Sequence, residues 1–311
     1  MIIHTSKTIR LVLVGLCSIA CACRAQLNEP SAAEKQKIWD AIPDTATVQP
    51  TSPTKLLVFS RAWGYKHSSI PYGREMAKAM AHKTKAFEVV LAEDLSSFEW
   101  DKLQAFDAIF FNNTNNEIFL PENVDQLTPE ERKLAEARDA RLKQNLVRFI
   151  SEGKGLAVIH AGVASFRLWP EYGKIMGARF DNHPWNAGST IQLHIEDTSH
   201  PLCECFDHAS QFEITDEIYQ FKEYDRSLLR VLFRIDTESV NVKTKSGVHR
   251  TDGDFALSWI KPYGKGRIYY SALGHQNDIF WNETIVQHYL DGIQYALGNL
   301  KADASSLPLK N

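Results

Sequence analysis

Polar side chains with catalytic or ligand-binding chemistry directly follow three apolar segments of the sequence. The first group contains His67, the second contains Asn113 and Thr114, and the third begins at His160. In a parallel sheet covered by helices, ligands bind at the carboxyl ends of the strands. We therefore expect these groups to meet at one site. Side-chain amides both donate and accept hydrogen bonds, which suits a hydroxyl-rich ligand, with loop capping as the alternative role of the asparagines.

His160 ends the apolar run 155–160 and is followed by small residues and then by a helix-like sequence. Hydrolases expose their nucleophile at such a strand–turn–helix junction. Because histidine stands where Ser or Cys would be needed, an acyl-enzyme mechanism is not expected. The imidazole can act instead as a general base or as a metal ligand. If nothing else converges on it, the histidine is structural.

Further candidates combine imidazoles, carboxylates and aromatic rings at loop positions: His183, Trp185, Asp216, Glu217, Tyr219 and His275. A tryptophan face is a common platform for a sugar ring. Four histidines at loop positions with one carboxylate could form a divalent metal site, for which zinc is the candidate ion. No short spacing such as H-x-H or H-E-x-x-H supports that site. The remaining histidines of the second half are expected at surface or packing positions: His194, His200, His208, His249 and His288.

Composition excludes several classes of protein. The 311 residues are 44% hydrophobic and 23% charged, which is typical of a globular protein. The 35 Lys+Arg residues do not exceed the 38 Asp+Glu residues, which argues against a dedicated nucleic-acid binder. No apolar run reaches the roughly 18 residues of a membrane-spanning helix. The sequence contains no G-x-G-x-x-G, P-loop or serine elbow, so neither nucleotide binding nor serine hydrolysis is supported.

The order of elements predicts an α/β fold. Continuous apolar runs are expected as parallel strands, at 55–60, 87–92, 108–112 and 155–160. Helical patterns at 70–83 and 128–151 separate them, which indicates a doubly wound sheet with helices on both faces. Extra strands, some of them antiparallel, are expected in the C-terminal half, at 189–196, 211–214, 228–235, 255–260 and 267–271. A last helix at 282–297 ends before Gly298.

The first 25 residues have the features of a secretory signal peptide, because positive charges precede the apolar stretch 11–22 and small residues follow it. Residues 18–21 also resemble a bacterial lipobox with Cys21 as the lipidated residue, although serine stands where leucine is preferred. Ordinary cleavage after Ala22 or Ala25 is the alternative. We therefore expect an exported protein that is periplasmic or lipid-anchored.

The remaining segments outside the predicted domain are short. Residues 26–54 are expected to be a linker with one short helix, and residues 301–311 a C-terminal tail. Only Cys203 and Cys205 are expected in the folded part, as free thiols or as a strained local disulfide. A Cys-x-Cys pair alone lacks the second pair of a structural zinc site.

The motifs taken together resemble the trehalose-utilisation (ThuA-like) family over residues 55–300. They occur in one order along the chain: GYKHS at 64–68, FDAIFFNNT at 106–114, GKGLAVIH at 153–160, WPEYG at 169–173, HPW at 183–185, DEIYQF at 216–221, YGKGR at 263–267 and ALGH at 272–275. This resemblance implies a flavodoxin-like fold akin to class I glutamine amidotransferases, with His160 where those enzymes carry their nucleophilic cysteine. It also implies sugar metabolism, alongside oxidoreductases that handle keto-sugars.

One feature departs from the family pattern. Related sequences carry polar residues, including an acid, just after the elbow histidine, whereas Ala161, Gly162, Val163 and Ala164 follow here. A working histidine base commonly needs a partner that orients its ring. Either Asp216 or Glu217 therefore substitutes for the missing acid, or catalysis is impaired.

The leading hypothesis is an exported enzyme that isomerises or hydrolyses a keto-sugar. His160 would move the proton next to the carbonyl group, and Glu217, with Asp216, would be its partner. The other site candidates would bind the sugar: His67, Asn113, Thr114, His183, Trp185, Tyr219 and His275. The candidate metal ligands are His160, His183 and His275. A non-catalytic sugar-binding protein and an accessory subunit of a sugar dehydrogenase are the alternatives.

Overall fold

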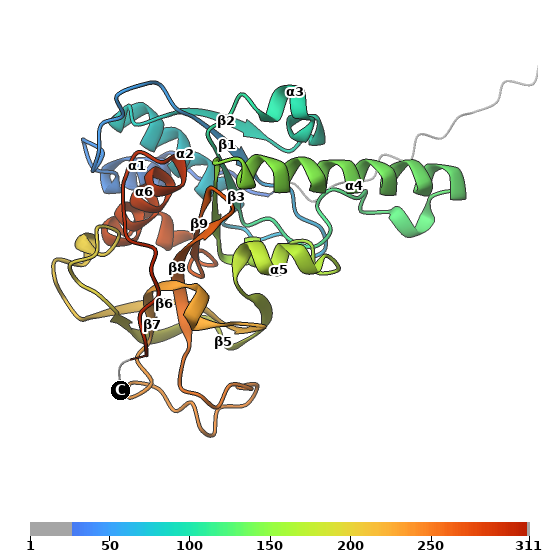
Figure 1. Cartoon of the computed structure of the whole chain (residues 1–311). Helices are drawn as coiled ribbons and strands as arrows, with labels where there is room; N and C mark the ends of the chain where they lie inside the picture. The colour runs from blue at the N-terminus through green and yellow to red at the C-terminus, as the bar shows by residue number, and fades with distance from the viewer. Residues whose placement is uncertain (1–26, 310–311) are drawn as a thin grey trace, which may run out of the picture.

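One nine-stranded sheet organises residues 27–309, which are the residues that this computed structural model describes (Figure 1). The predicted signal peptide lies outside the described residues. The strand order is β2-β1-β3-β4-β9-β8-β7-β5-β6. In the described chain, no helix is both long and apolar enough to cross a membrane.

The first five strands in that order are parallel and form the doubly wound half of the sheet. Their bounds are β2 Glu88–Ala92, β1 Lys55–Phe59, β3 Ala108–Asn112, β4 Gly155–Ile159 and β9 Gly266–Ser271. The order, with β1 between β2 and β3 and with β4 next to β3, is that of the flavodoxin-like fold. Strands β3 and β4 are completely buried, because helices cover both faces of the sheet. The predicted fold class is confirmed.

The other four strands are antiparallel and extend the sheet beyond β9. Their bounds are β8 Ala256–Tyr263, β7 Arg230–Ile235, β5 Arg179–Ile195 and β6 Gln211–Lys222. Strands β5 and β6 are much longer than the predicted segments 189–196 and 211–214. Register shifts interrupt their pairing between Phe180 and Ser189. These irregularities, together with Pro184 and Gly188, hide the strand pattern in the sequence.

Helices lie on both faces of the parallel strands (Figure 1). One face carries α1 Ala32–Ala41, α2 Ile70–Thr84 and α6 Glu283–Leu297. The other carries α3 Trp100–Leu103, α4 Pro129–Ser151 and α5 Pro170–Met176. Thr128 and Glu131 form a capping box at the start of α4, and Gly298, with φ 84°, ends α6 in the left-handed conformation.

The segments before and after the predicted domain pack against it within the described residues, and the short helix expected in the first of them is α1. Ile38 of α1 is completely buried in the core. After α1, Thr47 hydrogen-bonds to Asp291 of α6. At the other end, His200 Nε2 donates to the carbonyl oxygen of Asp303 at 3.0 Å. Burial of apolar side chains and satisfaction of backbone carbonyls hold both segments in place.

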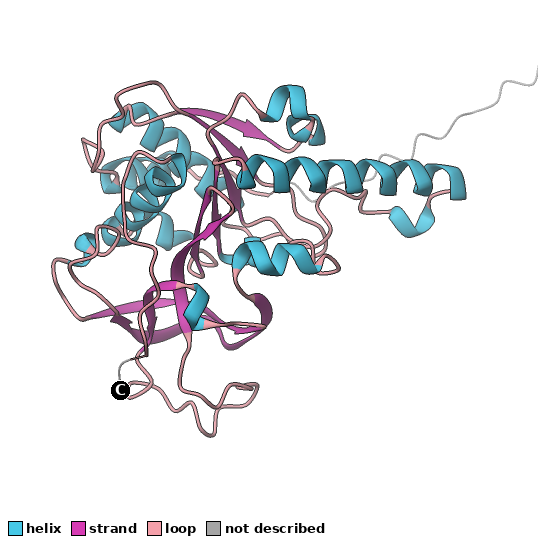
Figure 2. Ribbon diagram, viewed as in Figure 1, coloured by secondary structure: helices cyan, strands magenta, loops and turns pink. Residues whose placement is uncertain are grey.

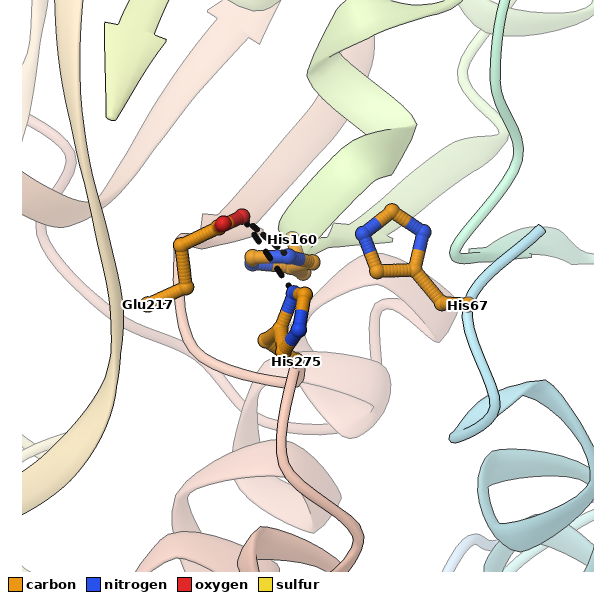
Figure 3. Close-up of side chains that lie close together, drawn as sticks. All are labelled: His67, His160, Glu217 and His275. Atoms are coloured by element: carbon orange, nitrogen blue, oxygen red, sulfur yellow. Dashed lines mark ion pairs between the residues drawn. The ribbon is translucent and has the colours of Figure 1, made fainter. Parts of the chain in front are cut away.

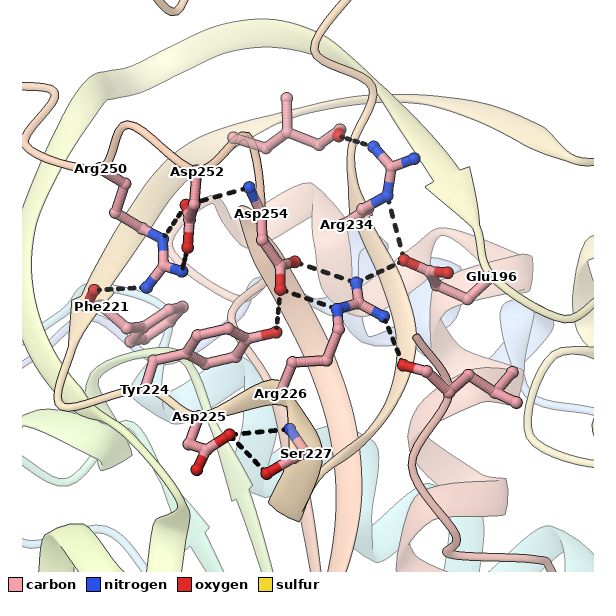
Figure 4. A network of polar contacts seen from close by, with 12 residues as sticks. Glu196, Phe221, Tyr224, Asp225, Arg226, Ser227, Arg234, Arg250, Asp252 and Asp254 are labelled. Atoms are coloured by element: carbon pink, nitrogen blue, oxygen red, sulfur yellow. Dashed lines mark hydrogen bonds and ion pairs between the residues drawn. The ribbon is translucent and has the colours of Figure 1, made fainter. Parts of the chain in front are cut away.

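A buried charge network holds the antiparallel half together (Figure 4). Arg226 donates to Asp254 at 2.7 Å and to Glu196 at 2.6 Å, and Arg234 donates to the same Glu196 oxygen at 3.0 Å. Tyr224 donates to Asp254 at 2.9 Å. Removing one member of such a network leaves an unpaired buried charge, which costs about 3–5 kcal/mol. The network therefore fixes the segment before β8 relative to the segment before β7.

Cys203 and Cys205 are free thiols, in agreement with one of the two expectations for this pair. Cys203 is buried, and burial raises the pKa of its thiol well above the usual range. An inert core role fits this cysteine better than a metal role.

Candidate metal centre and adjoining surface

Three imidazoles and one carboxylate from distant parts of the chain meet at the carboxyl edge of the parallel strands (Figure 3). His67 lies between β1 and α2, His160 follows β4 and His275 follows β9. Glu217 comes from β6 in the antiparallel half. The four candidate ligand atoms all lie within 4.8 Å of one another. We call these four residues the His₃Glu cluster.

His160 occupies a sharp turn in which its orientation is fixed by two partners. Its backbone is left-handed, with φ 43°, at the start of a 3₁₀ turn. Nδ1 lies 2.7 Å from the carbonyl oxygen of Ala272, which can only accept, so Nδ1 carries a proton. The lone pair of the neutral ring is therefore on Nε2, which lies 2.9 Å from the Tyr219 hydroxyl. The rings of His160 and Tyr219 also stack, with their centroids 4.4 Å apart.

Glu217 is the shared acidic partner of the histidines. Oε2 lies 3.5 Å from His160 Nε2 and 3.3 Å from His275 Nδ1. Its side chain is only 10% exposed. Burial works to raise the pKa of Glu217, but the interaction with the neighbouring imidazoles of His160 and His275 outweighs burial and holds the pKa well below its usual range. The carboxylate is therefore ionised and available as a ligand.

His67 is a buried imidazole with one unpaired ring nitrogen. Its Nδ1 has no hydrogen-bond partner among the described residues. Its ring meets those of His160 and His275 edge to face, at centroid distances of 4.8 and 5.1 Å. Burial, followed by repulsion from those two histidines, lowers the pKa of His67 to about 2. A buried, neutral imidazole with an unpaired nitrogen beside two other histidines and a carboxylate can act as a ligand of a metal cation.

Asp216 holds the loop that carries His275 in position. The Asp216 carboxylate accepts the backbone N–H groups of Gly274 at 2.7 Å, His275 at 3.3 Å and Gln276 at 2.9 Å. Asp216 is completely buried, and burial raises its pKa. Asp216 thus anchors a loop, and the expectation that it is catalytic is not supported. Interaction with Glu217 overcomes the effect of burial and raises the pKa of His275, although its Nδ1 forms no hydrogen bond of acceptable geometry within the described chain.

The cluster fits a divalent transition-metal ion. In a tetrahedral site with metal–ligand distances of about 2.0–2.2 Å, neighbouring ligand atoms lie about 3.3–3.6 Å apart. The separations from Glu217 to His160 and His275, 3.5 and 3.3 Å, already have this length. Two buried Nδ1 atoms, in His67 and His275, lack hydrogen-bond partners among the described residues. Three imidazoles with one carboxylate suit zinc, and also iron, manganese, cobalt or nickel.

His183 was predicted as a metal ligand, but it lies outside the cluster and His67 takes its place. Its Nδ1 is 3.3 Å from Glu217 Oε1, the oxygen that faces away from His275. The His183 side chain is 45% exposed. Because Asn186 Oδ1, also 3.3 Å away, and Glu217 are both acceptors, Nδ1 carries the proton and Nε2 keeps its lone pair. His183 therefore lies at the rim of the cluster, with a partly exposed side chain and an unprotonated Nε2 in its neutral ring.

Three other predicted sugar-binding residues have structural contacts instead. Trp185 is buried and packs edge to face against Phe255 at 5.8 Å, so its ring cannot carry a sugar. Asn113 is completely buried and donates to Ser69 Oγ and to the Gly274 carbonyl. The Thr114 hydroxyl pairs with Ser165 at 2.7 Å. These two polar side chains align the loops that carry the cluster.

Tyr65 is an aromatic residue at the site that sequence reasoning missed. Its ring is 61% exposed, lies edge-on to His67 at 4.7 Å and stacks over His275 at 6.1 Å. Its position in the GYKHS motif, two residues before His67, was the available signal. Of the remaining histidines, His288 is completely buried and His208 is exposed, as expected for residues outside a site.

Comparison with known proteins supports the fold and names a family. Residues 55–296 match the ThuA family, which is described as "Trehalose utilisation". A ThuA-like protein from Bacteroides uniformis is similar in structure, with 17% identity, a TM-score of 0.58 and coverage of 79% of this chain and 93% of that one. A ThuA-like protein from Parabacteroides merdae has 15% identity, a TM-score of 0.53 and coverage of 81% and 93%. No curated protein matches the sequence.

Proposed function

The chain belongs to the ThuA family of trehalose utilisation, and from that premise we propose that it is a metal-dependent enzyme that acts on a keto-sugar. The observation that carries the proposal is the His₃Glu cluster, in which the buried Nδ1 of His67 has no hydrogen-bond partner and Nδ1 of His275 faces only the Glu217 carboxylate among the described residues. A purely structural cluster would be expected to satisfy the His67 nitrogen, because a buried unpaired polar atom costs about 1–3 kcal/mol. A divalent ion held there would act as a Lewis acid toward a carbonyl oxygen of the substrate.

The side chains divide into ligands and a proton carrier. His160 is completely buried and its Nε2 faces Tyr219 and Glu217, so we assign it to the ion and not to proton transfer. His183 is the better base, because Nε2 is unprotonated in the neutral ring and the side chain reaches solvent. Glu217 holds the opposite nitrogen of that ring, as a carboxylate does for a catalytic histidine.

The reaction that suits this arrangement is isomerisation by proton transfer. His183 Nε2 takes the proton from the carbon next to the substrate carbonyl, and the electron pair of that C–H bond moves onto the carbonyl oxygen. The hydroxyl hydrogen on the deprotonated carbon then passes to the former carbonyl oxygen, and the abstracted proton returns to the former carbonyl carbon. The new carbonyl group lies at the carbon that lost the proton, so the step needs no oxidant or reductant. A positioned base of this kind contributes about 10²–10⁴-fold in rate.

The site contains an acidic side chain although the turn after His160 is apolar. Residues 161–164 are buried and offer no carboxylate. Glu217 of β6 lies 3.5 Å from His160 Nε2 and supplies one from another part of the chain. This substitution favours the enzyme over the alternative of a sugar-binding protein without activity.

Solvent exchange tests the proposed function whichever isomer the reaction forms. The ion-loaded protein is incubated with ketoses and keto-disaccharides in D₂O, and deuterium next to the carbonyl is followed by NMR. We expect exchange with the wild type and a loss of about 10²–10⁴-fold in His183→Ala. His208→Asn, a substitution of an exposed histidine elsewhere on the surface, is the matched control. Absence of exchange across the panel, or full exchange in His183→Ala, would contradict the proposal.

We also propose that the protein is exported, because its first 25 residues have the pattern of a secretory signal. Mass spectrometry of the mature chain tests this. A start after Ala22 or Ala25 indicates plain cleavage, and a diacylglyceryl mass on Cys21 indicates a lipid anchor. A mature protein that retains residues 1–21 rules out both.

A further inference from the structure

A groove adjoins the His₃Glu cluster through His183. It has a volume of about 610 Å³ and lies between β5 and the segment that connects β7 to β8. His183 lines the groove and also lies 3.3 Å from Glu217 of the cluster. The groove therefore adjoins the cluster at His183, the proposed base, which contacts both.

Most of the residues that line the groove have neutral side chains that form hydrogen bonds. Besides His183 they are Asn182, Asn186, Asn241, Thr244 and Ser246. Amides and hydroxyls both donate and accept, as the hydroxyl groups of a sugar do. Lys245 adds one ammonium group that forms no ion pair within residues 27–309. A lining of this kind matches a neutral, polyhydroxylated ligand better than an apolar or a strongly anionic one.

One wall of the groove is formed by the long loop between β7 and β8 (Figure 2). Hydrogen bonds to the neighbouring strands hold this loop in place. The carbonyl oxygen of Gly247 accepts from Asn182 at 2.7 Å and from Gln220 at 2.8 Å. Gln220 in turn accepts the backbone N–H of His249 at 3.0 Å. The loop is thus tied to both β5 and β6, the strands that carry His183 and Glu217. A preformed wall lowers the entropic cost of binding.

We propose that this groove is a second sugar subsite, which holds the neighbouring pyranose ring of a disaccharide while the reacting ring lies at the His₃Glu cluster. The inference rests on the proposed function for the identity of the reacting ring. The substrate is accordingly a keto-disaccharide or a glycoside of similar size, and a free monosaccharide leaves half of the surface empty.

The groove is tested by binding, which requires neither turnover nor the ion. Calorimetric titrations compare trehalose, maltose and cellobiose with glucose, using the mature protein both ion-loaded and ion-stripped. The variant is Ser246→Trp, because Ser246 is exposed and its side chain makes no described hydrogen bond. Ser210→Trp, at an exposed serine outside the groove, is the matched control.

We expect at least one disaccharide to bind about tenfold or more tightly than glucose, and Ser246→Trp to abolish that preference while Ser210→Trp retains it. Equal binding of disaccharides and glucose would overturn the subsite, as would a preference that survives in Ser246→Trp. If the disaccharide binds in this manner but no keto-sugar exchanges its proton, the proposed reaction fails while the subsite stands. If a keto-sugar exchanges its proton but no disaccharide binds more tightly than glucose, the proposed reaction stands while the subsite fails.

Discussion

The hydroxyl group of Tyr219 lies 2.9 Å from Nε2 of His160, the one nitrogen of that ring that can bind a cation. The carbonyl of Ala272 occupies the other nitrogen, so the tyrosine and an ion compete for the same lone pair. The ring of Tyr219 also stacks on the imidazole at 4.4 Å and contributes to its orientation independently of the hydroxyl. These two effects can be separated by substitution.

Tyr219→Phe keeps the stacked ring and removes the competing donor. We expect the variant to bind zinc as tightly as the wild type or up to about tenfold more tightly, because a hydrogen bond has a net value of about 0.5–1.5 kcal/mol. Competition with a chromogenic chelator measures the dissociation constant. Tyr263→Phe, which removes a hydroxyl bonded to Glu171 away from the cluster, serves as the control. A tenfold weaker affinity in Tyr219→Phe would mean that the hydroxyl supports the ion.

His67 gives the ion-stripped protein a defined response to acid. Its pKa of about 2 in the folded state lies below the ordinary value of 6.5, so the unfolded chain binds a proton that the folded chain does not. The stability associated with neutral His67 is therefore present above pH 6.5 and is lost as the pH falls toward 2. One such site contributes a slope of up to about 1.4 kcal/mol per pH unit.

Urea unfolding of the stripped protein at pH 7, 6 and 5 measures that slope. His67→Asn should unfold with a shallower dependence on pH than the wild type, while His208→Asn should follow the wild type. If His67→Asn and the wild type lose stability in parallel, the imidazole is not held neutral in the fold.

Asp216→Asn distinguishes a loop anchor from a catalytic acid. The carboxylate accepts three backbone N–H groups of the loop that carries His275, and an amide cannot replace all of these charged contacts. We expect the free energy of unfolding to fall by about 1–3 kcal/mol. Affinity for zinc should fall about 10–100-fold, as it does when a group that orients a ligand is removed.

At saturating zinc, the same variant should keep its proton-exchange rate to within tenfold of the wild type. Asp225→Asn, which alters a carboxylate that caps an exposed 3₁₀ turn, is the control for removal of an acid. A loss of about 10²-fold or more in Asp216→Asn at full ion occupancy would return Asp216 to a role in proton transfer.

Local sequence patterns were sufficient to predict the parallel half of the fold. The continuous apolar runs at β1, β3 and β4 are readable because both faces of those strands are buried. The irregular pairing of β5 with β6 is not readable, since bulges and a proline interrupt the alternation, and so Glu217 and Tyr219 could not be placed on a strand.

Three of the residues singled out in the sequence, His160, Glu217 and His275, lie together in the structure, but the sequence does not fix the role of each. His160 and His275 follow strands that are neighbours in the sheet, which the topology brings together. Contacts between segments that lie far apart in the sequence decide whether Trp185 faces solvent or the core. Such contacts also decide whether His67 or His183 approaches Glu217 Oε2. No local pattern encodes those contacts, so the ligand set changed and Tyr65 was overlooked.

The most direct test of the account is the metal content of the purified mature protein, measured by inductively coupled plasma mass spectrometry after reconstitution and removal of excess ion. We predict about one divalent transition-metal ion per chain in the wild type and in His208→Asn, and almost none in His67→Ala and His275→Ala. A wild type that retains no ion after exposure to zinc, iron, manganese, cobalt and nickel would contradict the account. So would histidine variants that, still folded by circular dichroism, retain as much ion as the wild type.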